Sequence, residues 1–425
     1  MKDDYSQLLI EVQKKSNIRV NSIGDLKFLQ EDIKTTTGIA IGFNTLRRLF
    51  GFLEKTKPSI NTLNSVSKYI DFNSFSHYKN NQKKFDEWYF QQYLQRILLS
   101  KKINNDDIDF INQCINYNEN IVYLGYFLSF HIQRNNLEIL DYVFENVSFK
   151  NISGTNFHKF STILSTSFLN LSEDNYVSLY RALIHHNNFR NNIPLTYIDY
   201  THLNSRYLKV LGIIEELGDN NSDLLFVSLM KFHNYFYREE DILGLDIKKP
   251  QDFDGFYVVL KGRYYGYKIM KGKKINPSIK REIINITKDN KANQFLQEIV
   301  PVLIIKEEYI FLEELINLFY EDLFESDRWD AHTSAAIYLI ALANVNWKNK
   351  NIKIAKSNLD LVEVDKVELG YESYVFLFYY LTKVKISFSE NKTVDNKHSY
   401  TKIKKIVKIT GFTKFVTKAN KYLIK

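Results

Sequence analysis

The sequence predicts an all-α protein: a short N-terminal helical domain joined to an α-solenoid of antiparallel helix pairs. First, apolar blocks of about ten to eighteen residues follow one another along the chain, and their spacing of three and four is helical. Second, five prolines and fifteen glycines in 425 residues are few for a fold of strands and tight turns. Third, the polar connectors are short, so we expect consecutive helices to pack as antiparallel neighbours.

Residues 1–80 form the predicted N-terminal domain, in which three short helices follow one another. The first helix carries three apolar residues on one face at helical spacing, namely Leu26, Leu29 and Ile33. Gly38 is expected to end this helix, because glycine is the usual residue in a left-handed helix cap.

The second helix of this domain has one apolar and one polar face. Leu46 and Leu49 are three residues apart and therefore share the buried face. The polar residues of the helix must then point away from the core, and these are Asn44, Arg47 and Arg48. A helix that displays Asn and Arg in front of a packed helix is an arrangement by which proteins read the DNA major groove.

Gly51 is expected to end the second helix, and the pair Pro58 and Ser59 opens a third. The inner face of the third helix consists of three apolar residues, Leu63, Val66 and Ile70. Three amphipathic helices in any bundle would show the same spacing, and in that interpretation the Arg pair is a solvated surface.

The segment resembles the Xre-type (Cro-repressor-like) helix-turn-helix. The residues that carry the resemblance are Gly38, the pair Ile41 and Gly42, Leu46, Leu49, Gly51, and the run Pro58-Ser59-x-x-Thr62-Leu63. The resemblance implies binding to double-stranded DNA, with Asn44, Arg47 and Arg48 against base edges or phosphates. In the loop after this recognition helix, Lys55 and Lys57 are expected to hold the DNA backbone.

Residues 81–107 are expected to connect the two domains. Lys83–Ser100 predicts a strong helix, because its apolar residues lie largely on one side. The polar stretch Lys101–Asp107 then separates this helix from the rest of the chain.

Residues 108–425 are predicted to form the helical array. Its clearest apolar blocks are Ile108–Ile115, Ile121–Ile132, Leu137–Val147, Tyr176–His185, Tyr207–Leu217 and Leu224–Tyr237. A chain of helical hairpins of this length usually forms a solenoid rather than one globular bundle.

The clearest repeat signal lies in Tyr338–Leu359. Leu342 and Ala343, followed by Ala355 and Leu359, match the small and apolar positions of a tetratricopeptide repeat, and the segment resembles that family. The two alanines let the helices of one hairpin approach closely, while the leucines fill the seam between them. The resemblance implies a tetratricopeptide-like array with a groove for a peptide or protein effector.

Tyrosines are abundant in the array, and five of them have two interpretations. They either line such a groove or belong to the core between the helices; they are Tyr257, Tyr264, Tyr267, Tyr338 and Tyr374.

The net charge of +8 is concentrated at the two ends of the chain. Residues 391–425 contain ten lysines and one acid, Asp395. Residues 1–80 contain twelve basic and eight acidic residues, and the middle of the chain is close to neutral. Basic patches at both ends make a polyanion such as nucleic acid the natural partner.

Seven of these ten lysines lie in Tyr400–Ile424. This segment predicts a terminal helix or helix pair whose apolar residues, among them Ile403, Ile406 and Ile409, face inward. The lysines of the outer face are expected to contact a polyanion or an acidic partner, and they are Lys402, Lys405 and Lys408. The alternative is a solvated cap, since the ends of a solenoid require a polar surface.

The sequence predicts no catalytic centre, cofactor site or metal site. Gly262 and Gly266 flank tyrosines within a predicted helix and are expected to be packing contacts rather than a phosphate loop. His185 and His186 are adjacent, so on a helix they would point to different faces, unlike two metal ligands one turn apart. The single cysteine, Cys114, excludes an internal disulfide and is expected to be buried.

A polar cluster near the middle of the array, Asp327, Arg328, Asp330 and His332, is explained most simply as an acid-rich helix N-terminus. The N-terminus of the chain lacks the apolar core of a secretory signal, and no apolar run approaches the length of a membrane span. We therefore expect a cytoplasmic protein without a membrane partner.

Two functions of different classes remain. The first is a cytoplasmic DNA-binding transcriptional regulator whose helical array forms a homodimer or binds a peptide or protein effector. The second is a non-enzymatic helical-repeat adaptor or scaffold that uses its N-terminal domain to dock on a protein. A salt-dependent affinity for duplex DNA separates the two, because phosphate contacts weaken steeply as salt rises.

Overall fold

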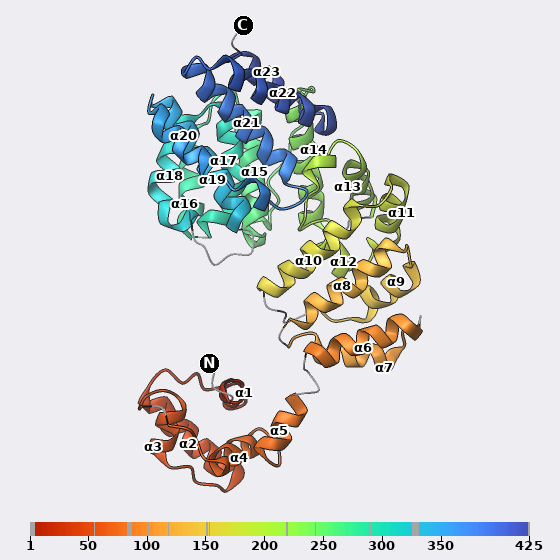
Figure 1. Ribbon diagram of the computed structural model, residues 1–425, viewed down its shortest axis with the longest axis vertical. Coiled ribbons are helices and arrows are strands. Elements are labelled where there is room, and N and C mark those ends of the chain that lie inside the picture. The colour runs from red at the N-terminus through yellow and green to blue at the C-terminus, as the bar shows by residue number, and fades with distance from the viewer. Residues whose placement is uncertain are drawn as a thin grey trace. The chain divides into compact units, whose positions relative to one another are not determined.

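The computed structural model describes residues 5–54, 56–82, 87–100, 102–117, 119–149, 152, 154–217, 220–242, 244–289, 291–324 and 331–423. Every regular element within these residues is a helix, which confirms the predicted all-α fold (Figure 1). The chain divides into two compact units, Met1–Ser100 with Tyr117–Asn120 and Lys101–Asn116 with Ile121–Lys425. The first unit thus includes the helix that the sequence assigns to the connection between domains.

The helices of the first unit, within its described residues, are α1 (Ser6–Ser16), α2 (Ile23–Thr37), α3 (Phe43–Leu49), α4 (Ile60–Tyr69), α5 (Phe75–Gln82) and α6 (Glu87–Ser100). The three helices predicted from the apolar spacing are α2, α3 and α4. Their predicted inner faces are buried in one core, which contains Leu26, Leu29, Ile33, Leu46, Leu49, Leu63, Val66 and Ile70. Helix α1, which was not predicted from the sequence, adds Leu8 and Val12 to this core.

Caps at the helix ends explain the bounds of these elements. Ser22 and Asp25 form a capping box at the start of α2, in which the Ser22 hydroxyl accepts from the Asp25 N–H and the Asp25 carboxylate accepts from the Ser22 N–H. Gly38 ends α2 with φ +70°, as the sequence predicts. Ser59 begins α4 by accepting a hydrogen bond from the Thr62 N–H.

The second unit is a long succession of helices. Within its described residues they are α7 (Asn105–Cys114), α8 (Asn120–Gln133), α9 (Leu137–Asn146), α10 (Gly154–Leu169), α11 (Glu173–Leu183), α12 (Asn187–Asn192), the 3₁₀ helix η2 (Tyr200–His202), α13 (Arg206–Leu217), α14 (Asn221–Arg238), η3 (Phe253–Gly255), α15 (Val258–Lys271), α16 (Pro277–Asp289), α17 (Ala292–Lys306), α18 (Tyr309–Leu323), α19 (Ala331–Lys348), α20 (Ile352–Asp360), η4 (Val364–Lys366), α21 (Glu372–Ser389), α22 (Thr393–Thr410) and α23 (Lys414–Asn420).

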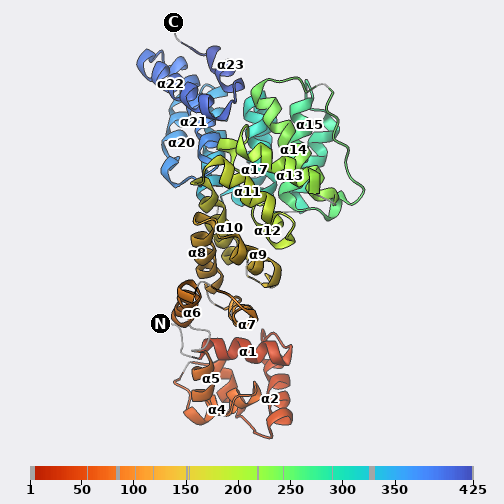
Figure 2. The ribbon, with the colours of Figure 1, turned by 90° about the vertical axis from the view of Figure 1, so that its right-hand side faces the viewer.

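Helices of the second unit pack against their neighbours along the chain. α17 contacts α18 and α19, α19 contacts α20 and α21, and α21 contacts α22 and α23 (Figure 1). Helices α13, α14 and α15 pack in the same sequential way (Figure 2). This pattern is that of a helical solenoid. The six predicted apolar blocks correspond to α7, α8, α9, α11, α13 and α14, although the block Tyr176–His185 extends two residues beyond the end of α11. Among the described residues, no helix has both the length and the apolar character needed to cross a membrane.

Small residues lie where these helices cross most closely. Ala343 of α19 and Ala355 of α20 are fully buried, and their helices pack against each other. A Cβ atom added to Gly262 of α15 would lie 2.5 Å from the Phe295 carbonyl oxygen of α17. A Cβ atom at Gly266 would lie 3.3 Å from another carbonyl oxygen of α17. The prediction that both glycines are packing contacts is therefore confirmed.

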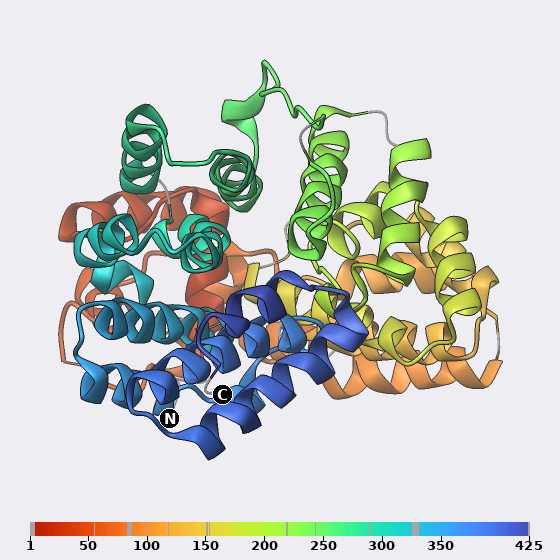
Figure 3. The same cartoon turned by 90° about the horizontal axis from the view of Figure 1, so that it is seen from above.

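The C-terminal helices of the second unit pack back against its middle (Figure 3). α21 and α22 contact η2, and α23 contacts α14. The rings of Tyr200 and Tyr374 stack with their centroids 4.4 Å apart, and the hydroxyls of Tyr237 and Tyr374 lie 3.2 Å apart. The Thr413 hydroxyl donates to the Arg238 carbonyl, 175 residues earlier in the chain, at 2.9 Å. An open solenoid has no contacts of this range, so this unit closes on itself.

Most of the five tyrosines considered for a groove belong to the core. Tyr264, Tyr267, Tyr338 and Tyr374 are buried, whereas Tyr257 is 87% exposed. A cavity beside Tyr374 has a volume of only about 10 Å³ and an apolar lining of Pro301, Ile304, Ile337, Ile340, Val375 and Phe378. Such a cavity is the size of a water molecule and cannot hold a peptide. The core interpretation is confirmed for four of the five tyrosines.

Candidate functional site

Helix α3 is fixed by its inner face and presents polar groups on its outer face. Leu46 and Leu49 are buried in the core of the first unit, as their spacing predicts. Asn44 and Arg48 are exposed, so both side chains are available to a partner. This part of the predicted DNA-binding surface has the orientation that the sequence implies.

Arg47 differs from Arg48, because it also takes part in the structure around α3. Its side chain is only half-exposed; its Nη1 donates to Asn44 Oδ1 at 3.3 Å, and its Nε is buried without a hydrogen-bond partner among the described residues. Its carbonyl oxygen accepts from the N–H groups of Phe52 and Leu53, at 2.8 and 3.2 Å. Of the two arginines, only Arg48 is a fully surface residue.

The loop between α3 and α4 carries the two lysines that the sequence assigns to the DNA backbone. Lys57 is exposed directly before the N-terminus of α4. Lys55 lies outside the described residues. The first N–H groups of a helix carry a partial positive charge, so Lys57 and the start of α4 together form a favourable location for an anion.

The C-terminal lysines divide into two groups. Those of the predicted outer face lie on α22: Lys405 and Lys408 are exposed, Lys402 is half-buried, and none of the three forms an ion pair within the described residues. The lysines on α23 and at its C-terminal end are instead paired with carboxylates: Lys414 lies 4.0 Å from Glu239. Lys418 and Lys421 lie 3.3 and 3.7 Å from Glu307.

One detail of the α22 prediction is wrong. Ile403 is buried and Ile406 is half-buried, but Ile409 is 59% exposed. The residues fail to share one face because Ile403 and Ile409 are six apart, which corresponds to about 1.7 turns on a helix of 3.6 residues per turn and places them about 120° apart around the helix. Thr410 is the buried residue at this end of α22.

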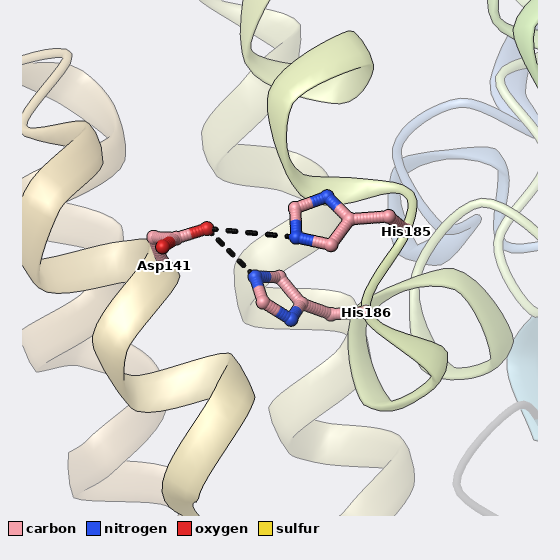
Figure 4. A group of neighbouring side chains, drawn as sticks. All are labelled: Asp141, His185 and His186. Atoms are coloured by element: carbon pink, nitrogen blue, oxygen red, sulfur yellow. Dashed lines mark hydrogen bonds and ion pairs between the residues drawn. The ribbon is translucent and has the colours of Figure 1, made fainter.

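The two adjacent histidines also differ from the prediction, because they do not lie on a helix. α11 ends at Leu183 and α12 begins at Asn187, so His185 and His186 lie in the turn between them. Both rings face Asp141 of α9, as Figure 4 shows. The argument that adjacent residues point apart is therefore wrong here. The missed signal is the carboxylate pair Asp141 and Glu145, which are four residues apart and share one face of α9.

The structure also contains a buried lysine that the sequence analysis does not identify. Lys385 of α21 is 1% exposed, and its Nζ donates to the Tyr309 hydroxyl at 2.8 Å and to Asn344 Oδ1 at 2.9 Å. Its ammonium group lies 5.4 Å from the Trp347 ring centre. Burial lowers the pKa of Lys385 to about 7. The sequence does carry a signal for this burial: Lys385 is four residues after Leu381 and therefore shares a face with that apolar residue on a largely apolar helix.

The lowered pKa of Lys385 predicts a dependence of stability on pH. Between pH 7 and about 10.5 the unfolded chain keeps the Lys385 proton while the folded chain loses it, so stability must increase as pH rises through this range. The slope is at most about 1.4 kcal/mol per pH unit for one proton. Thermal melting between pH 7 and pH 9.5 is expected to show the rise in wild type and a smaller rise in Lys385→Met. The exposed control Lys405→Met keeps the wild-type slope, and equal slopes in all three proteins would contradict the assignment.

Two further predictions concern the single cysteine and the polar cluster around His332. Cys114 is fully buried, as expected, and burial raises the pKa of its thiol to about 12. Asp327, Arg328 and Asp330 lie outside the described residues. His332 is exposed on the first turn of α19 and lies 3.3 Å from Glu363.

Comparison with known proteins adds no family to these observations. No family model, curated protein or solved structure matches the chain.

Proposed function

We propose that the chain is a cytoplasmic DNA-binding transcriptional regulator, with α3 as its recognition helix. In this proposal Asn44, Arg47 and Arg48 contact base edges or phosphates of double-stranded DNA, and Lys55 and Lys57 hold the DNA backbone. The observation that supports it best is the two-sided character of α3, a short helix that is anchored by buried leucines and exposes Asn and Arg. The resemblance to the Xre-type helix-turn-helix indicates that the expected ligand of this face is double-stranded DNA.

The helical array is proposed to form a homodimer or to bind a peptide or protein effector. The supporting observation is that large apolar side chains are exposed on α18 and α20, two of the helices that pack against α19. Ile310 and Leu318 of α18 and Ile354 of α20 are all more than half exposed. Since the tyrosine-rich interior is filled, the proposed contact is on the outer surface rather than in an internal groove.

The second candidate is a non-enzymatic adaptor or scaffold whose N-terminal unit docks on a protein. One observation favours it, because Phe28 of α2 is 72% exposed and Ile23, five residues earlier on the same helix, is also exposed. Exposed large apolar side chains are more typical of protein contacts than of contacts with phosphate. The two candidates predict opposite results for DNA binding.

Arg48→Ala is the sharpest test of DNA binding. We expect the full-length variant to unfold at the wild-type temperature, because Arg48 is exposed, but to bind duplex DNA more weakly. If Arg48 neutralises one phosphate, the slope of log affinity against log salt decreases by about one. Fluorescence anisotropy with a labelled duplex at several salt concentrations measures both quantities.

Lys68→Ala provides the matched control for this test. Lys68 is exposed in the last turn of α4, eight residues after the first residue of the helix, which places it about 12 Å along the axis from the N-terminus that follows Lys57. The control is expected to keep the wild-type affinity. An Arg48→Ala variant that binds as tightly as Lys68→Ala and wild type excludes α3 as the DNA contact. A wild-type chain without salt-dependent DNA affinity favours the adaptor instead.

The α22 lysines are tested by the triple change Lys402→Gln, Lys405→Gln and Lys408→Gln. The variant is expected to fold normally, because the three residues form no ion pairs in the described structure, and glutamine retains helix propensity. We expect it to bind DNA, or an acidic partner that copurifies with the chain, more weakly at low salt.

A second triple variant removes the same charge elsewhere in the unit. Lys348, Lys353 and Lys356 are exposed on α19 and α20, and their replacement by glutamine is expected to leave binding unchanged. Equal binding by both triple variants would mean that the α22 lysines serve only as the solvated end of the array.

A further inference from the structure

Four side chains from two separate segments, Asp141, Glu145, His185 and His186, converge between α9 and the turn that joins α11 to α12. Figure 4 shows three of them, Asp141, His185 and His186. His186 Nε2 lies 2.7 Å from Asp141 Oδ1, and His186 Nδ1 lies 2.9 Å from Glu145 Oε2. His185 Nε2 lies 3.8 Å from the same Asp141 oxygen. The two imidazole rings lie against each other, with their centroids 3.9 Å apart.

The two contacts of His186 cannot both be hydrogen bonds if its ring is neutral. A neutral imidazole has one N–H group and one lone pair, so it can donate to Asp141 or to Glu145 but not to both. The His186 side chain is only 4% exposed, and solvent does not readily replace either contact. With a neutral ring and two carboxylates, one ring nitrogen therefore faces a carboxylate oxygen without a hydrogen between them, and a metal ion bound to both atoms would make this contact favourable.

We propose that Asp141, His185 and His186 bind a divalent metal ion of the zinc type, such as Zn²⁺ or Co²⁺. One ligand atom of each residue lies within 4.8 Å of the other two. In a tetrahedral site with metal–ligand bonds of about 2.0–2.1 Å, the ligand atoms are about 3.3 Å apart. The separations from the Asp141 oxygen, 2.7 Å to His186 Nε2 and 3.8 Å to His185 Nε2, lie on either side of this value, and shifts of the three side chains are needed to complete the geometry.

Glu145 would act as the residue that orients a ligand. Metal-binding histidines usually donate their other N–H to a carboxylate, which fixes the ring and its tautomer. Glu145 Oε2 accepts from Nδ1 of His186, and this leaves the Nε2 lone pair for the metal ion on the side of Asp141. The contact between His186 Nδ1 and Glu145 therefore fits the metal-bound site, in which Nε2 binds the ion, better than the metal-free cluster.

The ligand set also specifies the class of metal. Two imidazoles and one carboxylate suit zinc and neighbouring transition metals, whereas calcium and magnesium prefer oxygen ligands alone. The His185 side chain is 58% exposed and that of Asp141 is 52% exposed, so an ion can enter from solvent and keep water in its fourth position. The bound ion would connect α9 to the turn between α11 and α12.

Binding is tested on the full-length chain, purified without a histidine tag and treated with a chelator. Cobalt titration is expected to produce the visible absorption of a tetrahedral Co²⁺ site and to saturate at one ion per chain. Zinc is expected to displace the cobalt and to raise the melting temperature as its concentration increases, since a ligand that binds only the folded state stabilises it. His185→Ala is expected to weaken binding at least tenfold, and it is exposed enough to leave the fold intact.

The matched control is His332→Ala. The His332 side chain is 55% exposed and faces one carboxylate, Glu363, but it has no second histidine within that ion pair. We expect its removal to leave metal affinity unchanged. Glu145→Gln, which retains all three ligands, is expected to weaken binding by about 10–100-fold.

Two results would overturn the proposal: no uptake of zinc or cobalt at a large molar excess, or equal affinity of wild type and His185→Ala. The cluster would then be a network of polar contacts that does not bind a metal ion. Circular dichroism of each variant verifies folding. Because the variants retain α3, failure here leaves the test of DNA binding unaffected.

Discussion

Gly262→Ala is expected to lower the free energy of unfolding of the second unit by about 1–3 kcal/mol or more. The added methyl group would lie 2.5 Å from the Phe295 carbonyl oxygen and 3.1 Å from Glu298 Cβ. Both obstacles are close to the backbone of α17 and cannot rotate away, so α15 and α17 must separate. Urea or thermal unfolding of the full-length chain, followed through the transition of this unit, measures the effect.

Gly212→Ala provides a control with the same chemical change. Gly212 lies within α13, where an added Cβ atom has no neighbour within 4 Å. Alanine is the better helix former by roughly 0.5–1 kcal/mol, so this variant is expected to be slightly more stable than wild type. Opposite signs for the two substitutions would establish the close crossing of α15 and α17. Equal stability of the two variants would mean that α15 and α17 lie farther apart at Gly262 than the structure shows.

Glu298→Gln is expected to cost about 3–5 kcal/mol, the largest effect of any substitution considered for this chain. Glu298 of α17 forms a bidentate ion pair with Arg263 of α15, with N–O distances of 3.1 and 3.2 Å. Both side chains are only 8% exposed. Removing the negative charge leaves the guanidinium buried without its counter-ion. Chemical unfolding of the variant and of wild type under the same conditions provides the comparison.

Two further variants separate the loss of a charge from the loss of packing. Arg263→Met combined with Glu298→Leu removes both charges, and it is expected to recover much of the lost stability. Glu216→Gln breaks the exposed pair with Arg181, whose two side chains are about 60% exposed, and is expected to change stability by at most about 0.5 kcal/mol. A Glu298→Gln variant as stable as Glu216→Gln would contradict the buried ion pair.

The sequence predicts the helices of this chain well because they depend on local patterns. The spacing of Leu46 and Leu49 places α3 correctly, and Gly38 and Ser59 mark the ends of its neighbours. Neither the half-burial of Arg47 nor the turn after α3 was predictable from this spacing, which specifies only the residues that face the core. In that turn the chain folds back, and two N–H groups hydrogen-bond to the Arg47 carbonyl.

Features that depend on tertiary contacts were missed or only partly predicted. The helix predicted for Tyr176–His185 ends two residues early, and that small difference moves His185 into a turn beside His186. The ring contacts with Asp141 then follow from the packing of α11 and α12 against α9, which no local pattern encodes. The contact between η2 and α21 is equally nonlocal, since Tyr200 and Tyr374 lie far apart in the sequence. Aromatic content predicts a core but does not identify the partners within it.

The return of the C-terminal helices to η2 and α14 has a consequence for synthesis of the chain. A ribosome adds about 5–20 residues per second, so the 175 residues between Arg238 and Thr413 take roughly ten to thirty seconds to appear. During that time the aromatic side chains of η2 and α14 lack the rings of α21 and α23 that cover them in the finished fold. The nascent protein therefore exposes an apolar surface until its last helices emerge, and this is the interval in which it is most vulnerable to aggregation and most in need of a chaperone.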